Sequence, residues 1–166
     1  MTRLSQFFYQ STPHQQLLLA AFVLLKVILI FMLPLTGDEA YFIVWGQTPA
    51  FGYYDHPPAV GWVLGMMGSL ADNLVWYRSF AFVAAIIISY LIYRLILLHS
   101  NNDALESQKN IALWVAMAFF ISPLSLMFVV TANDTVLVLF SMLGVYFFVK
   151  TLKQQQWGDA LLAGFF

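Results

Sequence analysis

The sequence predicts an all-α protein, a polytopic bundle of transmembrane helices. Composition is the first reason: 61% of the residues are hydrophobic, 9% are charged and the mean hydropathy is +0.80, whereas ordinary globular domains carry about 25% charged residues. The second reason is that the apolar residues form runs long enough to cross a bilayer. The third is the segment 37–73, which separates two of these runs and gathers acids and aromatic side chains.

Four apolar runs pass or approach the length of about 17 to 25 residues that a spanning helix needs. We expect these helices over residues 17–35, 74–98, 111–130 and 135–149, the last being marginal in length. A fifth run begins at Ala160 and continues to Phe166, where the sequence ends. We therefore expect residues 1–166 to be the N-terminal portion of a longer membrane domain, truncated on its C-terminal side.

Charge and cysteine content exclude several classes of partner and site. The formal net charge is -1, and no cluster of Lys and Arg could neutralise a row of phosphates. Nucleic acid is therefore not an expected partner. The sequence contains no cysteine, which excludes disulfides and metal sites built from thiolates.

The basic residues favour a cytoplasmic N-terminus. If Met1 lies inside, Arg78 is near the outer face, Lys26 lies mid-span, and the remaining basic residues are cytoplasmic: Arg3, Arg94, Lys109, Lys150 and Lys153. This distribution follows the positive-inside rule. The outer acids are then Asp38, Glu39, Asp55, Asp72 and Asp134. In this orientation the polar segments 100–110 and 151–159 are inner connectors, and 37–73 is an outer loop.

The outer loop should hold two short helices that lie at the membrane interface. Asp38 can cap the first, which runs through Gln47 and places four side chains on one face: Asp38, Tyr41, Phe42 and Trp45. Proline suits the first turn of a helix, so the second should start at Pro58. Interfacial helices are commonly anchored by tryptophan, and the candidates are Trp45, Trp62 and Trp76.

Two polar pairs stand where apolar runs begin or end. Asp38 and Glu39 follow the first run, and their plainest role is helix capping with a solvated charge. A carboxylate beside a partly apolar wall can instead have its pKa raised enough to act as a general base toward a hydroxyl. Asn133 and Asp134 start the fourth run, where we expect one of them to cap the helix. An outer carboxylate there would also face the same cavity as Asp38.

The string YYDHPP is the most specific one in the outer loop. Proline pushes the residue before it into extended geometry, so Asp55 and His56 should be presented from a rigid, non-helical segment. A neighbouring carboxylate and imidazole can bind a divalent metal ion, orient a phosphate, or bond to each other. No third metal ligand is evident, so no cofactor is certain and a divalent ion is only a candidate.

Two cations fall inside apolar runs. Arg78, one turn into the second run, could extend to the interface or clamp a lipid phosphate with its planar guanidinium. Lys26 lies near the middle of the first run, where a charge costs on the order of 2.5 to 3.5 kcal/mol on insertion scales. Lys26 therefore needs an acidic or carbonyl partner. Pro34 and Pro123 should kink or end their helices.

The outer loop resembles that of a known enzyme family. The string GDEAYFIVWGQTPAFGYYDHPPAVGWVLG, which starts at Gly37, is similar to the first outer loop of the bacterial family 39 glycosyltransferases, relatives of the protein O-mannosyltransferases and the lipid A aminoarabinose transferase. In that family an acidic DEAYY follows the first span, and GYxDHPP comes later. Here Phe42 replaces the second Tyr of the first motif. WYRSFAFV around Arg78 and NDTVLVLFSMLGVYFF after Ala132 resemble two further motifs.

The resemblance implies part of a C-type glycosyltransferase fold, with 37–73 as its outer catalytic loop. It further implies transfer of a sugar, with inversion, from a polyprenyl-phosphate donor to a hydroxyl of a protein, lipid A or a glycan, outside the bacterial cytoplasmic membrane. Asp38 is implied as the leading catalytic carboxylate, and Glu39 and Asp134 as residues that shape the same cavity. The donor phosphate would face Arg78, His56 and Tyr54, and a divalent ion would be held by Asp55 and His56.

Two other interpretations remain open at this point. In a transporter or lipid flippase, Lys26 and the outer carboxylates would form a path for a cation or proton. That interpretation accounts for Lys26 better but leaves YYDHPP without a role. Alternatively, the chain is a non-catalytic fragment that packs against another membrane subunit. Even if the whole protein is an enzyme, we do not expect residues 1–166 alone to be active.

Overall fold

The computed structural model describes residues 12–99 and 105–166, and every regular element in those ranges is helical. In chain order they are α2 (Pro13–Met32), α3 (Gly37–Gln47), α4 (Ala59–Gly68), α5 (Leu74–Leu98), α6 (Leu105–Ile121), α7 (Pro123–Leu126), the 3-10 helix η2 (Met127–Val129), α8 (Asn133–Gln154) and α9 (Trp157–Phe165). The all-α prediction is therefore confirmed.

Three helices, α2, α5 and α8, are long and apolar enough to cross a membrane, and α6 with α7 would make a fourth span if the bent pair counts as one. The prediction for 74–98 coincides with α5. The predicted helix 17–35 is displaced, because α2 begins at Pro13 under the Thr12 cap and ends at Met32, before Pro34. The predicted helix 135–149, which was marginal in length for a span, is part of α8, which has 22 residues.

The predicted span 111–130 is a bent pair of helices. Its two parts are bent by 54° at a break between Ile121 and Pro123. Proline lacks an N–H and its ring clashes with the preceding turn, so a helix ends before it. Ser122 is extended there, and its side chain accepts a hydrogen bond from the Ser125 N–H, which starts α7 anew. The prediction that Pro123 interrupts its helix is thus confirmed.

The predicted inner connectors are shorter than the polarity suggests. Residues 105–110 already belong to α6. The rest of that predicted connector, residues 100–104, lies outside the described residues, as does Arg3. Only Gln155 and Gln156 separate α8 from α9, with Gln155 in the left-handed conformation at φ 51°. An ion pair of 2.7 Å between Lys150 and Asp159 joins the two helices.

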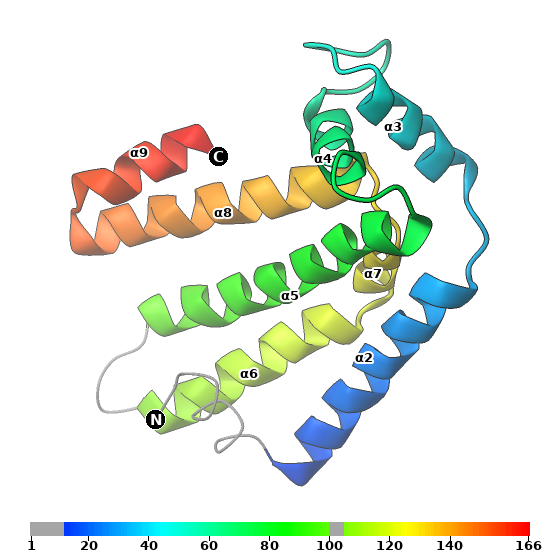
Figure 1. Cartoon of the computed structure of the whole chain (residues 1–166). Coiled ribbons are helices and arrows are strands. Elements are labelled where there is room, and N and C mark those ends of the chain that lie inside the picture. The colour runs from blue at the N-terminus through cyan, green and yellow to red at the C-terminus, as the bar shows by residue number, and fades with distance from the viewer. Residues whose placement is uncertain (1–11, 100–104) are drawn as a thin grey trace.

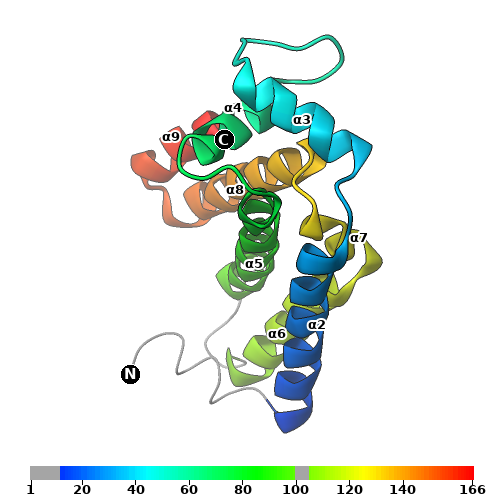
Figure 2. The same ribbon diagram turned by 45° about the vertical axis from the view of Figure 1, so that its right-hand side comes forward.

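The α3–α4 unit, residues 37–68, lies at one end of the molecule beside the start of α8 (Figures 1 and 2). Its two helices approach closely where Gly46 faces Gly65. A Cβ on Gly46 would stand only 2.8 Å from the Gly65 backbone nitrogen. A buried cluster ties the unit to α5 and α8: Phe42, Trp45, Val60, Leu64, Tyr77 and Val136. A second cluster joins α5, α6, η2 and α8 below it: Ala84, Ala85, Ile88, Phe120, Phe128 and Leu139.

Candidate functional site

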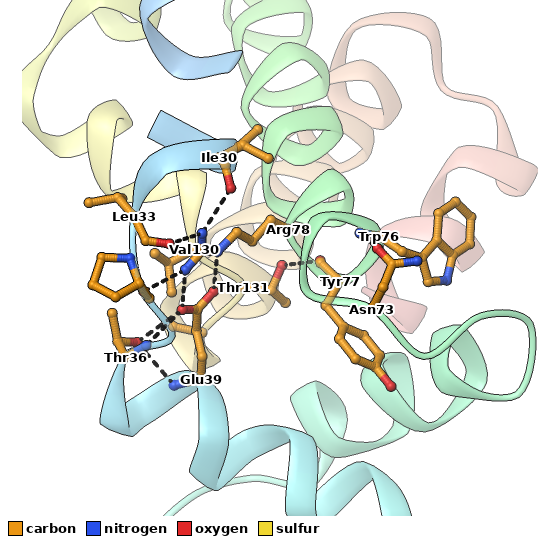
Figure 3. Close-up of polar contacts among 12 residues, drawn as sticks. Ile30, Leu33, Thr36, Glu39, Asn73, Trp76, Tyr77, Arg78, Val130 and Thr131 are labelled. Atoms are coloured by element: carbon orange, nitrogen blue, oxygen red, sulfur yellow. Dashed lines mark hydrogen bonds and ion pairs between the residues drawn. The ribbon is translucent and has the colours of Figure 1, made fainter. Parts of the chain in front are cut away.

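A buried ion pair connects the linker after α2, the start of α3 and the start of α5 (Figure 3). The Arg78 Nε and Nη2 donate to the two carboxylate oxygens of Glu39, each at 2.7 Å. The remaining N–H groups of Arg78 donate to the carbonyl oxygens of Ile30 and Leu33 at 2.8 Å and of Pro34 at 2.9 Å. We call this arrangement the Arg78 junction.

All five guanidinium donors are therefore used inside the protein. The side chains of Arg78 and Glu39 are 0% and 3% exposed, so Arg78 does not extend to the interface. Three of its acceptors are carbonyls at the end of α2 and just beyond it, where no following helical turn can satisfy them. Arg78 thus fixes the direction in which the chain leaves α2. Contact with a donor phosphate would require it to release one of these acceptors.

The start of α3 is built as a capping box. The Thr36 hydroxyl accepts from the Glu39 N–H at 3.3 Å, and the Glu39 carboxylate accepts from the Thr36 N–H at 3.1 Å. The prediction that Asp38 caps this helix is therefore wrong, because Thr36 is the N-cap. Glu39 carries both the cap and the ion pair, which points its side chain into the protein. The signal was present in the sequence as Thr36 followed three residues later by Glu39.

Asp38, next along α3, is exposed. In the part of the chain that the structure describes, its carboxylate accepts no hydrogen bond. Its position in the first turn suits a negative charge, because the helix dipole is positive there. The adjacent carboxylates of Asp38 and Glu39 thus have opposite environments, one free to meet a substrate and the other committed to the Arg78 junction.

A second polar group lies on the α3–α4 unit. Asp55 Oδ1 is 3.0 Å from His56 Nδ1 and accepts from the Tyr41 hydroxyl at 3.3 Å. The hydrogen bond from His56 is the main cause that lowers the pKa of Asp55, although partial desolvation opposes it. The pKa of Tyr41 is raised by partial burial and by the Asp55 charge, so this phenol stays a neutral donor.

The loop between α3 and α4 presents its aromatic residues unequally. Tyr53 stacks on Trp45 at 4.0 Å and donates to the Trp45 carbonyl at 2.8 Å. Trp45 is 5% exposed, so its prediction as an interfacial anchor is wrong. Trp62 is 44% exposed and remains available for that role. Tyr54, one residue beyond Tyr53, is fully exposed, so a ligand can reach its hydroxyl.

The structure adds no third ligand to the two candidate metal ligands, Asp55 and His56, among the described residues. Asp55 and His56 lie together, but nowhere in residues 12–99 and 105–166 do three His, Cys, Asp or Glu side chains gather in a way that could hold a metal ion. The donor set in these two ranges does not fit a metal centre built from their residues alone, and we build no step on a metal.

The start of α8 contributes the remaining acid. Neither Asn133 nor Asp134 caps the helix: Ala132 is the N-cap residue, and its N–H donates to the Thr135 hydroxyl at 3.3 Å. The capping prediction is therefore wrong, and Asp134 is exposed in the first turn. Val136, on the next turn, packs in the cluster that holds α3 and α4. This contact brings the first turn of α8 to the same end of the molecule as Asp38.

Thr131 is a site residue that sequence reasoning missed. Its hydroxyl donates to the Tyr77 carbonyl at 2.7 Å, and the side chain is 2% exposed (Figure 3). This bond fastens the segment before α8 to the first turn of α5, directly beside Arg78. A lone threonine between apolar runs gives no signal of such a contact, because the two segments are far apart in sequence.

Lys26 lies apart from this group. Its ammonium donates to the backbone carbonyl of Ser125 and to the Ser125 hydroxyl, at 3.1 Å for the latter, and lies 5.0 Å from the centre of the Phe120 ring. The carbonyl partner that the sequence required but did not identify is therefore Ser125.

Comparison with known proteins gives one match. The model of a family described as dolichyl-phosphate-mannose-protein mannosyltransferase matches residues 55–166, about two thirds of the chain. The matched range contains Asp55, His56, Arg78 and Asp134, whereas Asp38 and Glu39 precede it. No curated protein and no solved structure matches.

Proposed function

Since the chain belongs to the dolichyl-phosphate-mannose-protein mannosyltransferase family, a family of membrane glycosyltransferases, we propose that it moves a sugar from a polyprenyl-phosphate donor to a hydroxyl group. The acceptor class, a protein, lipid A or another glycan, is left to experiment. We further propose that transfer proceeds with inversion at the anomeric carbon, on the outer side of a bacterial cytoplasmic membrane, within a C-type glycosyltransferase fold.

One observation carries the site assignment: the exposed carboxylate of Asp38 stands beside the buried pair of Glu39 and Arg78. A general base needs an accessible carboxylate on a rigid support. The capping box and the Arg78 junction provide the support, because they fix the first turn of α3 on both sides of Asp38.

In the proposed reaction Asp38 accepts the proton of the acceptor hydroxyl as its oxygen attacks the anomeric carbon. The bond between that carbon and the phosphate oxygen breaks, and polyprenyl phosphate leaves with the electron pair. Because polyprenyl phosphate is a reasonable leaving group, the main tasks of the protein are to position the two substrates and to stabilise the phosphate charge. Attack opposite the leaving group inverts the configuration.

We propose that the donor phosphate is bound by His56 and Tyr54. Tyr54 is fully exposed and His56 partly so. Asp55 lies 3.0 Å from the Nδ1 of the imidazole, which leaves the Nε2 for the ligand. Glu39 acts as a positioning residue, and Asp134 lines the same cavity as Asp38. We assign Arg78 mainly to positioning, because its donors are occupied; direct contact with the phosphate remains a prediction from the family resemblance.

The contacts of Lys26 do not support the transporter alternative. It depended on Lys26 sharing a path with the outer carboxylates. In the described part of the chain, Lys26 contacts a backbone carbonyl, a hydroxyl and an aromatic ring, and no carboxylate. The contacts of Lys26 are thus those of a structural residue.

The test is sugar transfer by the full-length protein in membranes. Labelled sugars on polyprenyl phosphate are offered as donors, and the unsubstituted protein is compared with Asp38→Asn at matched protein level and insertion. We expect transfer to fall by about a hundredfold or more, the range for loss of a general base.

Asp72→Asn is the matched control, since it removes the same charge from an exposed aspartate in the same predicted outer loop, residues 37–73. The Asp72 side chain accepts from the Tyr77 hydroxyl at 2.9 Å, a bond that the amide oxygen of asparagine can also accept. Its transfer rate should match that of the unsubstituted protein. Equal rates for Asp38→Asn and Asp72→Asn would contradict the assignment of Asp38, and no transfer from any donor would contradict the proposed function.

A further inference from the structure

Lys26 is the second fully buried cation of the described chain, and the proposed reaction does not use it. It lies in the second half of α2, 0% exposed. Its partners are Ser125 in α7 and the ring of Phe120 in α6. The two partners stand on opposite sides of the break between α6 and α7, so one side chain of α2 contacts both halves of the bent pair.

Lys26 binds the chain just beyond the break. At Pro123 the regular ladder of backbone hydrogen bonds stops, and α7 has only four residues before η2 takes over with its tighter turn. The Phe119 carbonyl, which Pro123 leaves without its helical donor, accepts from the Ser122 N–H at 3.0 Å. The Ser125 carbonyl accepts from the Met127 N–H of the turn and has a second lone pair for another donor. The Lys26 ammonium offers three N–H groups, two of which reach the backbone and side chain of Ser125.

The bent segment in turn places the start of α8. Phe128 and Val129 of η2 are buried, with Phe128 in the cluster that includes Ala84 and Leu139. The chain then reaches Thr131, whose hydroxyl is bonded to the Tyr77 carbonyl. Asp134 follows three residues later, in the first exposed turn of α8.

We propose that Lys26 is a positioning residue for sugar transfer, a role that rests on the proposed function. By fastening Ser125 to α2 it fixes the bend, and through the short path from η2 to Thr131 it sets where Asp134 stands relative to α5. We call the contacts of Lys26 with Ser125 and Phe120 the Lys26 tether. The tether acts at a distance, since Lys26 touches neither the Asp38 region nor the Asp55–His56 pair.

The structural arm of the test measures the distance between α2 and η2. Spin labels are placed on cysteines that replace Leu24 and Met127, both exposed, at 59% and 71%, and residues 1–166 contain no native cysteine. We expect Lys26→Met to broaden or lengthen the distance distribution measured by pulsed electron paramagnetic resonance. Lys26→Arg, which keeps the charge and the donors, should stay close to the unsubstituted protein.

A second label pair on Leu24 and Val83 is the control, because it reports whether α2 stays packed on α5. It should not change. If Lys26→Met loses this packing as well, Lys26→Leu takes its place, since leucine is a shorter apolar side chain that can be buried and offers no donor to Ser125. An unchanged Leu24–Met127 distribution in the variant that keeps the control distance would overturn the tether.

The activity arm asks whether the tether matters for the reaction. Because a misplacement of about 1 Å can cost on the order of a hundredfold in rate, we expect Lys26→Met to lower kcat by up to that factor with little change in KM for the donor, and Lys26→Arg to restore it. A changed distance with unchanged kcat would overturn the positioning role. If the unsubstituted protein transfers no sugar, the proposed function fails, while the distance measurement still decides the tether.

Discussion

The Arg78 junction and the Lys26 tether solve the same physical problem in different ways. Each holds a cation that is 0% exposed within a helix long and apolar enough to span a membrane. Arg78, one turn into α5, is neutralised by the Glu39 carboxylate and also satisfies three carbonyls. Lys26, in the second half of α2, contacts a carbonyl, a hydroxyl and a ring.

The two buried cations differ in the partners that the surrounding chain provides. At the end of α2 the chain turns into a capped helix, so a carboxylate can be brought in with its charge compensated. Within the bundle the segment after the bend of α6 and α7 offers a backbone carbonyl and a hydroxyl instead. Removing Arg78 would strand a buried negative charge, whereas removing Lys26 would leave only neutral acceptors unpaired. The two regions should therefore differ in their sensitivity to substitution.

The largest expected effect is that of Arg78→Ala. Breaking a buried ion pair by removing one partner costs about 3–5 kcal/mol, and the three carbonyls beyond α2 also lose their donor. Thermal unfolding in detergent micelles measures the change. Arg94→Ala is the control, since Arg94 is only partly buried and bonds to the exposed Tyr90 of its own helix. A loss for Arg78→Ala no larger than that for Arg94→Ala would remove the basis of the comparison.

Lys26→Met should cost less than Arg78→Ala. Leaving neutral buried acceptors without a donor costs about 1–3 kcal/mol, and the methionine no longer has to bring a charge into the membrane, which offsets part of the loss. The same unfolding assay ranks the two variants. A destabilisation by Lys26→Met that equals or exceeds the one by Arg78→Ala would mean that the bend depends on the ammonium charge itself.

Thr36→Ala sharpens the comparison, because the chain offers a matched partner in Thr12→Ala. Both threonines accept at 3.3 Å from the N–H three residues on, that of Glu39 and of Gln15 respectively. Loss of such a cap costs about 0.5–2 kcal/mol. We expect Thr36→Ala to lie at the upper end, since its hydroxyl also contacts the Glu39 carboxylate at 3.2 Å. Equal losses would show that the Arg78 junction does not depend on its cap.

The smallest effect should come from Asp55, an outer charge that is exposed rather than buried. Because His56 lowers its pKa, the charged form is favoured by folding, and its contribution is present above the ordinary pKa of 3.8 and lost as the pH falls through the lowered value. The difference in unfolding temperature between the unsubstituted protein and Asp55→Asn should thus not shrink from about pH 7 to about pH 5. A difference that already shrinks in that range would contradict the lowered pKa.

Helix positions could largely be predicted from the sequence, because length and hydropathy are local. The bounds of α5 matched, as did the end of the α3 helix at Gln47 and the break at Pro123. The caps were misassigned because several polar residues compete at each helix start. Thr36 took the place expected of Asp38, and Ala132 that of Asn133 or Asp134.

The partners of the buried charges could not be predicted. Arg78 and Glu39 are 39 residues apart, and Lys26 and Ser125 are 99 apart, so only the packing of the helices brings each pair together. The environment of Trp45 could not be predicted either. Its neighbours in the sequence fit an interfacial tryptophan equally well, and only the fold shows that its ring stacks on Tyr53. The candidate site residues could be listed from the motifs, but which carboxylate is free and which is committed required the structure.

The most direct test compares the adjacent substitutions Asp38→Asn and Glu39→Gln in transfer and in thermal unfolding. Each removes one negative charge from the first turn of α3. We predict that Asp38→Asn abolishes most transfer at nearly unchanged stability, whereas Glu39→Gln lowers the unfolding temperature markedly, because it uncouples the buried Arg78. The opposite pattern, with a stable but inactive Glu39→Gln protein and a fully active Asp38→Asn protein, would contradict the division of roles between the free and the buried carboxylate.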